Sequence, residues 1–114
     1  MSRRWKGAVA VLSLGLVLGT SIPTAAAVRV RMRDGAAADQ NFYRPRRVVV
    51  EKGARVVWVN RGARPHTTTS NSGVWDSGTL QPGETFRRRF RKSGVFRYHC
   101  EIHDGMTGKI VVMA

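Results

Sequence analysis

The feature that most limits the fold of this chain is a series of short hydrophobic runs with period-two alternation. Residues 28–33, Val-Arg-Val-Arg-Met-Arg, alternate between apolar and charged side chains, as expected for a strand with one buried face. No stretch after residue 27 has the length and periodicity of an amphipathic helix. Further strands are predicted at 47–51, 55–60, from about 67, 85–91, 95–100 and 109–113, with a connection at 34–41. Seven or eight strands in the last 87 residues predict an all-β, Greek-key β-sandwich.

Arg88 fits this pattern poorly. In a regular strand it shares one face with Phe86 and Phe90, and an unpaired guanidinium inside a core costs several kcal/mol. We expect the Arg88 side chain to extend along the core to an end of the sandwich, with its charged head in water. The alternative is a β-bulge that resets the alternation.

The first 27 residues have the layout of a secretory signal peptide. Arg3, Arg4 and Lys6 form a basic region, an apolar run follows from Ala8, and small residues at 24–27 offer a cleavage site. The segment around Arg3-Arg4 also resembles the twin-arginine export signal. The alternative is an uncleaved membrane anchor, because the uncharged stretch 7–28 is 22 residues long. Cleavage leaves a mature domain at 28–114 in the periplasm or another extracytoplasmic space.

The chain is strongly basic, with 20 Lys+Arg against 7 Asp+Glu and a net charge of +13. Charge alone would suggest a nucleic-acid-binding protein, but an exported domain does not normally meet nucleic acid. After cleavage the charge is +10, which points to acidic protein partners, to anionic membrane surfaces, or to composition alone. The candidate docking residues for an acidic partner are Arg87, Arg89, Arg91 and Arg97.

Cys100 is the only cysteine, so no intramolecular disulfide can form. It opens the sequence Cys100-x2-His103-x2-Met106, and His66 follows Pro65 further upstream. One thiolate, two imidazoles and one thioether are soft or intermediate donors, a set that suits copper. Each residue taken alone is ordinary, since single cysteines and methionines usually fill cores. The four together predict a copper site, with Met106 as a weak axial ligand. His99 alternates away from Cys100 on its strand and is expected to face solvent.

The chain resembles the cupredoxins, the small blue copper proteins of the plastocyanin and amicyanin type. The resemblance covers nearly all of 28–114 and rests most on Gly94-x-Phe96-x-Tyr98-x-Cys100, with ligand gaps similar to those of amicyanin. It implies a monomeric two-sheet domain that shuttles single electrons. It also implies that Asn60 braces the ligand loops and that the backbone N–H of Thr67 bonds the cysteine sulfur, although the family commonly has Asn at the latter position.

Two further functions stay open beside the electron carrier. A copper-binding or delivery protein would use the same ligands, and an exported β-sandwich could bind partners through a basic face without a metal. Because four protein donors leave no open position for a substrate, the pattern favours a carrier over an enzyme.

Overall fold

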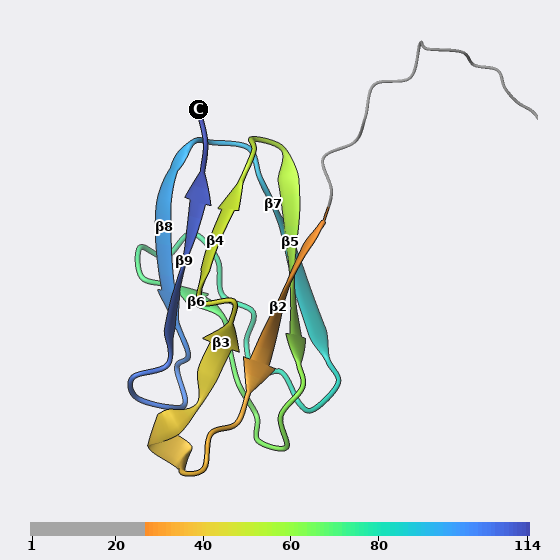
Figure 1. Ribbon diagram of the computed structural model, residues 1–114, viewed down its shortest axis with the longest axis vertical. Helices are drawn as coiled ribbons and strands as arrows, with labels where there is room; N and C mark the ends of the chain where they lie inside the picture. Colours follow the sequence, from red (N-terminus) through yellow and green to blue (C-terminus); the bar gives the residue numbers. More distant parts are fainter. Residues whose placement is uncertain (1–26) are drawn as a thin grey trace, which may run out of the picture.

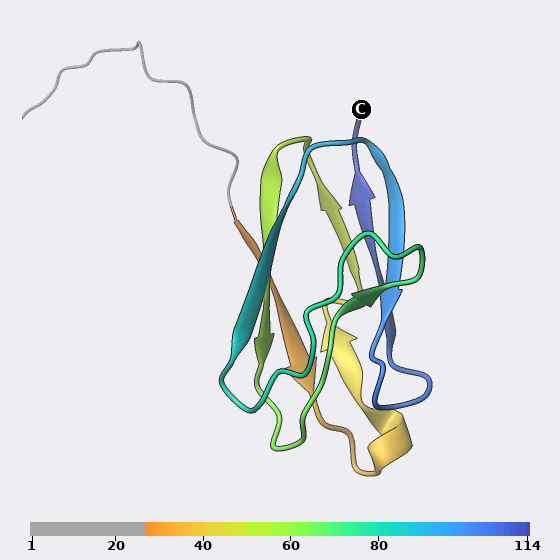
Figure 2. The same ribbon diagram turned by 180° about the vertical axis from the view of Figure 1, so that it is seen from behind.

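The computed structural model describes residues 27–114 as two facing four-stranded β-sheets, seen from opposite sides in Figures 1 and 2. The predicted signal peptide, except for Ala27, lies outside these described residues. Within 27–114 no helix is long and apolar enough to cross a membrane. The elements are β2 (Val28–Arg33), a 3-10 turn η3 (Ala38–Gln40), β3 (Phe42–Arg44), β4 (Arg47–Val50), β5 (Ala54–Asn60), β6 (Thr69–Ser70), β7 (Thr85–Phe90), β8 (Gly94–His99) and β9 (Thr107–Val112).

The sheets have the strand orders β3-β2-β5-β7 and β4-β9-β8-β6. Most neighbouring strands are not consecutive in the chain, so the chain crosses repeatedly from one sheet to the other. Pairs β2/β5 and β4/β9 are parallel, and the other pairs are antiparallel. The predicted all-β sandwich is confirmed. Because β2, β5 and β8 all run toward the same end of the sandwich, the segments that follow them meet there (Figure 1).

Aromatic side chains from both sheets fill the space between the sheets. Trp58 on β5 and Tyr98 on β8 are both completely buried, and their ring centroids lie 5.4 Å apart in an edge-on arrangement. Phe90 and Trp75 pack against Trp58 at centroid distances of 6.4 and 5.7 Å. Burial of each such side chain contributes about 1.5–3 kcal/mol or more. This packing makes the sandwich a rigid support for the segments at its ends.

Two short strands differ from the sequence prediction. The sequence pattern did not predict β3, which pairs with β2 through Arg31 and Arg44. β6 begins at Thr69, two residues later than expected. Neither strand is long enough to show an alternating pattern, and both exist because a neighbouring strand offers them backbone hydrogen-bond partners.

Arg88 lies on the core side of a regular strand. The pairing of β5 with β7 is continuous from Ala54 to Val59, so no bulge resets the alternation. The Arg88 side chain is half-buried, and its guanidinium carbon lies 5.5 Å from the centroid of Trp75 and 5.4 Å from that of Phe90. The structure thus excludes the bulge and leaves the side chain partly exposed, but Nε of Arg88 is buried without a hydrogen-bond partner, so the head is not fully in water as expected. The aromatic faces stabilise the cation instead.

We therefore predict that Arg88→Ala destabilises the domain by about 1–2 kcal/mol, because it removes both the packing of the side-chain stem and the cation–π contacts. Arg87→Ala is the matched control, since Arg87 is the exposed neighbour on the same strand, and we expect a change below about 0.5 kcal/mol. Urea unfolding followed by tryptophan fluorescence measures both. Equal effects for the two variants would contradict the packing role of Arg88.

Candidate metal centre

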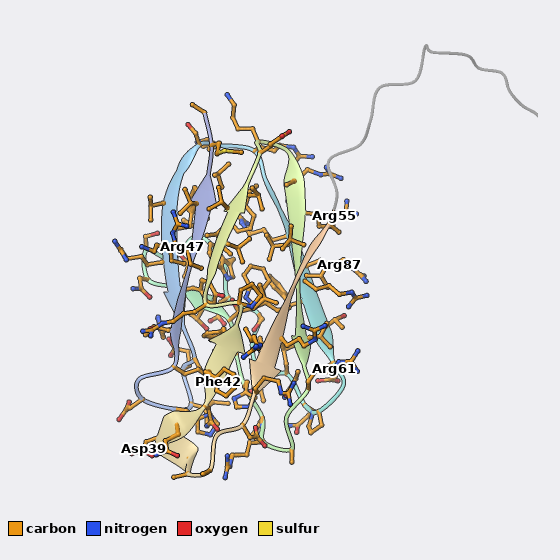
Figure 3. All side chains as sticks on the ribbon, viewed as in Figure 1. Asp39, Phe42, Arg47, Arg55, Arg61 and Arg87 are labelled. Atoms are coloured by element: carbon orange, nitrogen blue, oxygen red, sulfur yellow. The ribbon has the colours of Figure 1, made fainter. Side chains whose placement is uncertain are left out.

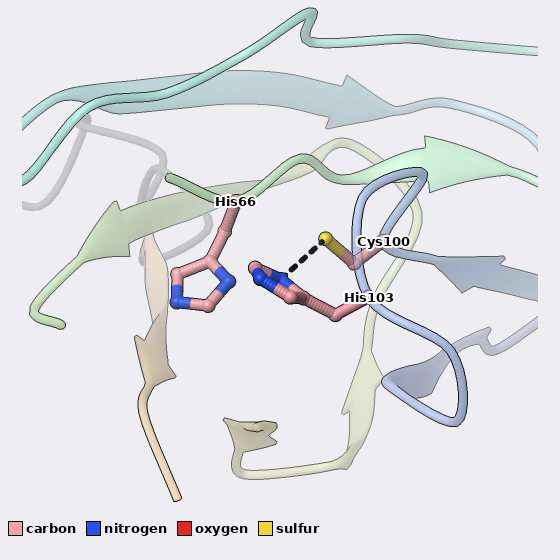
Figure 4. A group of neighbouring side chains, drawn as sticks. All are labelled: His66, Cys100 and His103. Atoms are coloured by element: carbon pink, nitrogen blue, oxygen red, sulfur yellow. Dashed lines mark hydrogen bonds between the residues drawn. The ribbon is translucent and has the colours of Figure 1, made fainter. Parts of the chain in front are cut away.

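Three potential metal ligands meet at one end of the sandwich, as Figure 4 shows. His66 lies in the segment after β5, Cys100 follows β8 directly, and His103 lies in the loop that leads to β9. One donor atom from each side chain lies within 4.8 Å of the others. Residues far apart in the chain thus meet because the strands that precede them end at the same edge.

The orientation of His66 is fixed by Asp34. His66 is completely buried, and its Nε2 lies 2.8 Å from Oδ1 of Asp34. The other carboxylate oxygen of Asp34 accepts hydrogen bonds from the backbone N–H groups of Ala63 and Arg64, at 2.7 and 3.2 Å. Burial by itself would raise the pKa of Asp34, but the Ala63 N–H and His66 lower it below its usual range. A charged carboxylate therefore holds the imidazole on the side away from the other donors.

The remaining nitrogen of His66 is available for a metal ion. Nδ1 is buried and has no hydrogen-bond partner in the protein, and the ring lies 5.0 Å from the ring of His103, centroid to centroid. A buried polar atom without a partner is costly. A metal ion between the three side chains would satisfy this atom.

Cys100 is prepared to act as a thiolate. Its side chain is nearly buried, and its Sγ accepts a hydrogen bond of 3.3 Å from the backbone N–H of Thr67. Burial would raise the pKa of this thiol, but His66, the backbone N–H groups of Thr67 and Ile102, and His103 together lower it to about 6. Near neutral pH the sulfur is mostly charged, the form that binds metals.

The third and fourth predicted ligands lie in the loop between β8 and β9. Nδ1 of His103 lies 3.7 Å from Sγ of Cys100, and the His103 side chain is half-exposed. Met106 is only 1% exposed, and its carbonyl accepts a 2.9 Å hydrogen bond from the Cys100 backbone N–H, which closes the loop. His103 therefore connects the site with the surface, whereas Met106 lies inside.

Asn60 and Thr67 brace these segments. The Asn60 side chain is completely buried, donates to the carbonyls of Arg64 and Leu80, and accepts from the Gly62 N–H at 2.9 Å. The Thr67 hydroxyl accepts a 2.9 Å hydrogen bond from the Glu101 backbone N–H. The bracing that the resemblance implied for Asn60 and the backbone bond implied for Thr67 are both present in this geometry.

His99 and the predicted docking arginines lie outside the cluster. His99 is partly exposed and contacts Asn71 and Glu101 at 2.5 and 2.6 Å. The four arginines do not share one surface. Arg87 and Arg89 are on β7, Arg91 is in the turn that follows, and Arg97 is on the other sheet.

Sequence reasoning did not find Asp34. It precedes His66 by 32 residues and lies in a segment predicted only as a connection. The parallel pairing of β2 with β5 brings it to the site, because Arg31 and Met32 lie beside Val59 and Asn60. No local pattern in the sequence marks such a contact.

A family model described as a cupredoxin-like domain matches residues 8–112. The chain belongs to the cupredoxin family. This cupredoxin is 34% identical to the amicyanin of Paracoccus denitrificans over 68 residues, which are 55% of this chain and 52%, about half, of that relative. It is 28% identical to amicyanin-alpha of Methylorubrum extorquens over 110 residues, 92% of this chain and 87% of the relative.

Solved structures agree with this assignment. A purple cupredoxin from Nitrosopumilus maritimus has a TM-score of 0.68 and 26% identity, over 75% of this chain and 99% of that chain. A mutant of amicyanin in its reduced Cu(I) form at pH 4 has a TM-score of 0.66 and 26% identity, over 76% and 82% of the two chains.

As a cupredoxin, the protein binds one copper ion, and the cluster of His66, Cys100 and His103 is its ligand site. The residues fit this ion well: a thiolate and imidazoles suit copper in both of its common oxidation states, and the buried Nδ1 of His66 has no other partner.

We predict that Cys100 in the metal-free protein titrates with a pKa of about 6. With this lowered pKa, the thiolate is nearly complete at pH 7.5, falls to one half near pH 6 and is lost at lower pH. Thiolate absorbance near 240 nm, taken as the difference between wild type and Cys100→Ser, measures the titration. A midpoint of 8 or above would contradict the stabilising contacts around the sulfur.

We also predict that Asp34→Asn weakens copper binding by about 10–100-fold, because a neutral amide holds the imidazole less firmly and makes it a weaker donor. Asp39→Asn, an exposed carboxylate in the same connection, is the control and should change affinity less than about twofold. Competition with a coloured copper chelator measures both affinities. Equal weakening by the two variants would show that only the charge matters, not the contact with His66.

Proposed function

We propose that this cupredoxin is an exported type 1 (blue) copper protein that carries single electrons between redox proteins. The observation that carries the proposal is the preformed set of soft donors, in which His66 is locked by Asp34 and the Cys100 thiolate by Thr67. When bound, the copper ion supplies a one-electron couple. The protein's part is to keep the donors in one arrangement, so that little reorganisation opposes electron transfer.

Met106 is proposed as the fourth, weak ligand. Its almost complete burial and its place at the end of the closed ligand loop support this role. A thioether is a weak ligand, which tunes the reduction potential without imposing a new geometry. With four protein donors no open position would remain for a substrate, so we propose a carrier and not an enzyme.

We propose that electrons enter and leave through His103. It is the half-exposed ligand, whereas His66 and Cys100 are buried. The adjacent residue Ile102 is 43% exposed and Pro65 is partly exposed, which gives the His103 edge an apolar border suited to brief contact with a redox protein. The carrier is proposed to be a monomer in the periplasm, with residues 1–27 removed on export.

Copper delivery is the alternative function with the same ligands. Delivery requires ready release of the metal, while the bonds from Asp34 and Thr67 favour retention. Comparing the rate of Cu(I) transfer to an acceptor with the rate of electron transfer to a redox protein separates the two. Faster metal transfer would favour delivery.

The decisive test of the site is spectroscopic. We expect the copper-loaded mature protein to have an intense blue thiolate-to-copper band that Cys100→Ser abolishes, because the band requires the sulfur. Met106→Leu should keep the band and change the reduction potential, since only the weak thioether donor proposed for the site would be lost. Visible absorption, EPR and voltammetry measure these properties. A colourless tetragonal Cu(II) site in the wild type would overturn the proposal.

A further inference from the structure

Three cations lie side by side on the outer face of the second sheet, away from the copper ligands. Arg47 on β4 is in register with Lys109 on β9, and Lys109 is in register with Arg97 on β8. The alternating burial along these strands places their side chains outside the core. Figure 3 shows Arg47 on this side of the molecule, whereas Arg55 and Arg87 project from the other sheet.

No carboxylate of the described residues compensates these charges. Within 27–114, the acidic ion-pair partners Asp34 and Glu101 contact His66 and His99, not these three cations. Like charges on directly opposed strand positions destabilise a sheet. A bound anion would therefore relieve the repulsion among these three cations.

The cations border a concavity. A groove of about 450 Å³ is lined by Arg47, Arg97 and Lys109, together with Arg46, Asn71 and Thr107. The Arg46 guanidinium donates a 2.8 Å hydrogen bond to the Thr107 hydroxyl, which holds this fourth cation at the groove. The Asn71 backbone N–H donates to the Arg97 carbonyl at 2.9 Å, which holds the amide beside β8. Tyr98 and Gly108 complete the lining. The groove is therefore bordered by four cations and contains no acidic side chain.

We propose that this groove binds a soluble oxyanion of the phosphate class. Guanidinium groups bind phosphate oxygens with paired, charge-assisted hydrogen bonds. Four cations exceed what one carboxylate can neutralise, and they match a phosphate dianion or a pyrophosphate. A concave site favours a small anion over a flat bilayer. None of the copper ligands lines this groove, so the proposal does not depend on the electron-carrier function.

The test is calorimetric titration of the copper-loaded protein with sodium phosphate and sodium pyrophosphate, at an ionic strength held constant with sodium chloride. The double variant Arg97→Gln/Lys109→Gln should weaken pyrophosphate binding at least about tenfold, since charged hydrogen bonds are lost. The charge-matched control is Arg29→Gln/Arg55→Gln on the outer face of the other sheet, which should weaken it less than about twofold. The blue absorption band checks that both variants remain folded and loaded.

Three outcomes of the binding measurements would overturn the proposal. They are the absence of phosphate and pyrophosphate binding, equal weakening by the two double variants, and binding only to phosphatidylglycerol vesicles. Equal weakening would mean that net charge alone attracts the anion. A measurement on the wild type needs no variant: amide NMR shifts on adding pyrophosphate should concentrate at Asn71, Thr107 and Lys109. Shifts centred on the other sheet would also reject the groove.

Discussion

Thr67 is the residue on which the metal site depends, because its hydrogen bonds connect both sheets with the cysteine ligand. Its carbonyl accepts a 2.6 Å bond from the Tyr43 hydroxyl on β3 of the first sheet. Its backbone N–H donates to Sγ of Cys100, and its hydroxyl accepts from the Glu101 N–H beyond β8 of the second sheet. Since Thr67 is itself buried, water does not compete with these bonds. A shift of the two sheets relative to each other would break at least one of them.

This arrangement explains how so small a domain can hold its ligands firmly. The sulfur and the buried imidazole are each fixed by groups that have other anchors: Thr67 through Tyr43, and Asp34 through the backbone of Ala63 and Arg64. Gly62 is part of the same constraint, because a side chain there would overlap the Asp34 carboxylate. Among the three clustered ligands, His103 alone lies partly at the surface. The buried His66 is therefore held rigidly, whereas His103 gives access to the site from outside.

The ligand cluster could be predicted from the sequence because three of its four proposed members lie within seven residues of one another. The sandwich could also be predicted, since strict alternation at 28–33 and the long strand at 54–60 leave few alternatives. The contact between Asp34 and His66 could not, because it depends on the parallel register of β2 and β5 and not on a local pattern. The same holds for the Arg47–Lys109–Arg97 row, which requires the strand order of the second sheet. Both features depend on which distant strands pair with each other, and local sequence patterns do not show that pairing.

The distribution of charge changes how the arginines relate to electron transfer. Three exposed acidic residues lie at the end of the sandwich that holds the metal ligands. They are Asp39 in η3 and Glu101 and Asp104 in the β8–β9 loop. Most arginines lie on the two sheets, and Arg91 is in the turn at the opposite end from the ligands. Arg61 and Arg64 are exceptions, because they follow β5 in the segment that carries His66. Charges beyond about 10 Å are largely screened at moderate salt. For a redox partner as proposed above, the sheet arginines would act mainly on its approach at low salt, whereas the exposed Ile102 and the partly exposed Pro65 border His103 itself.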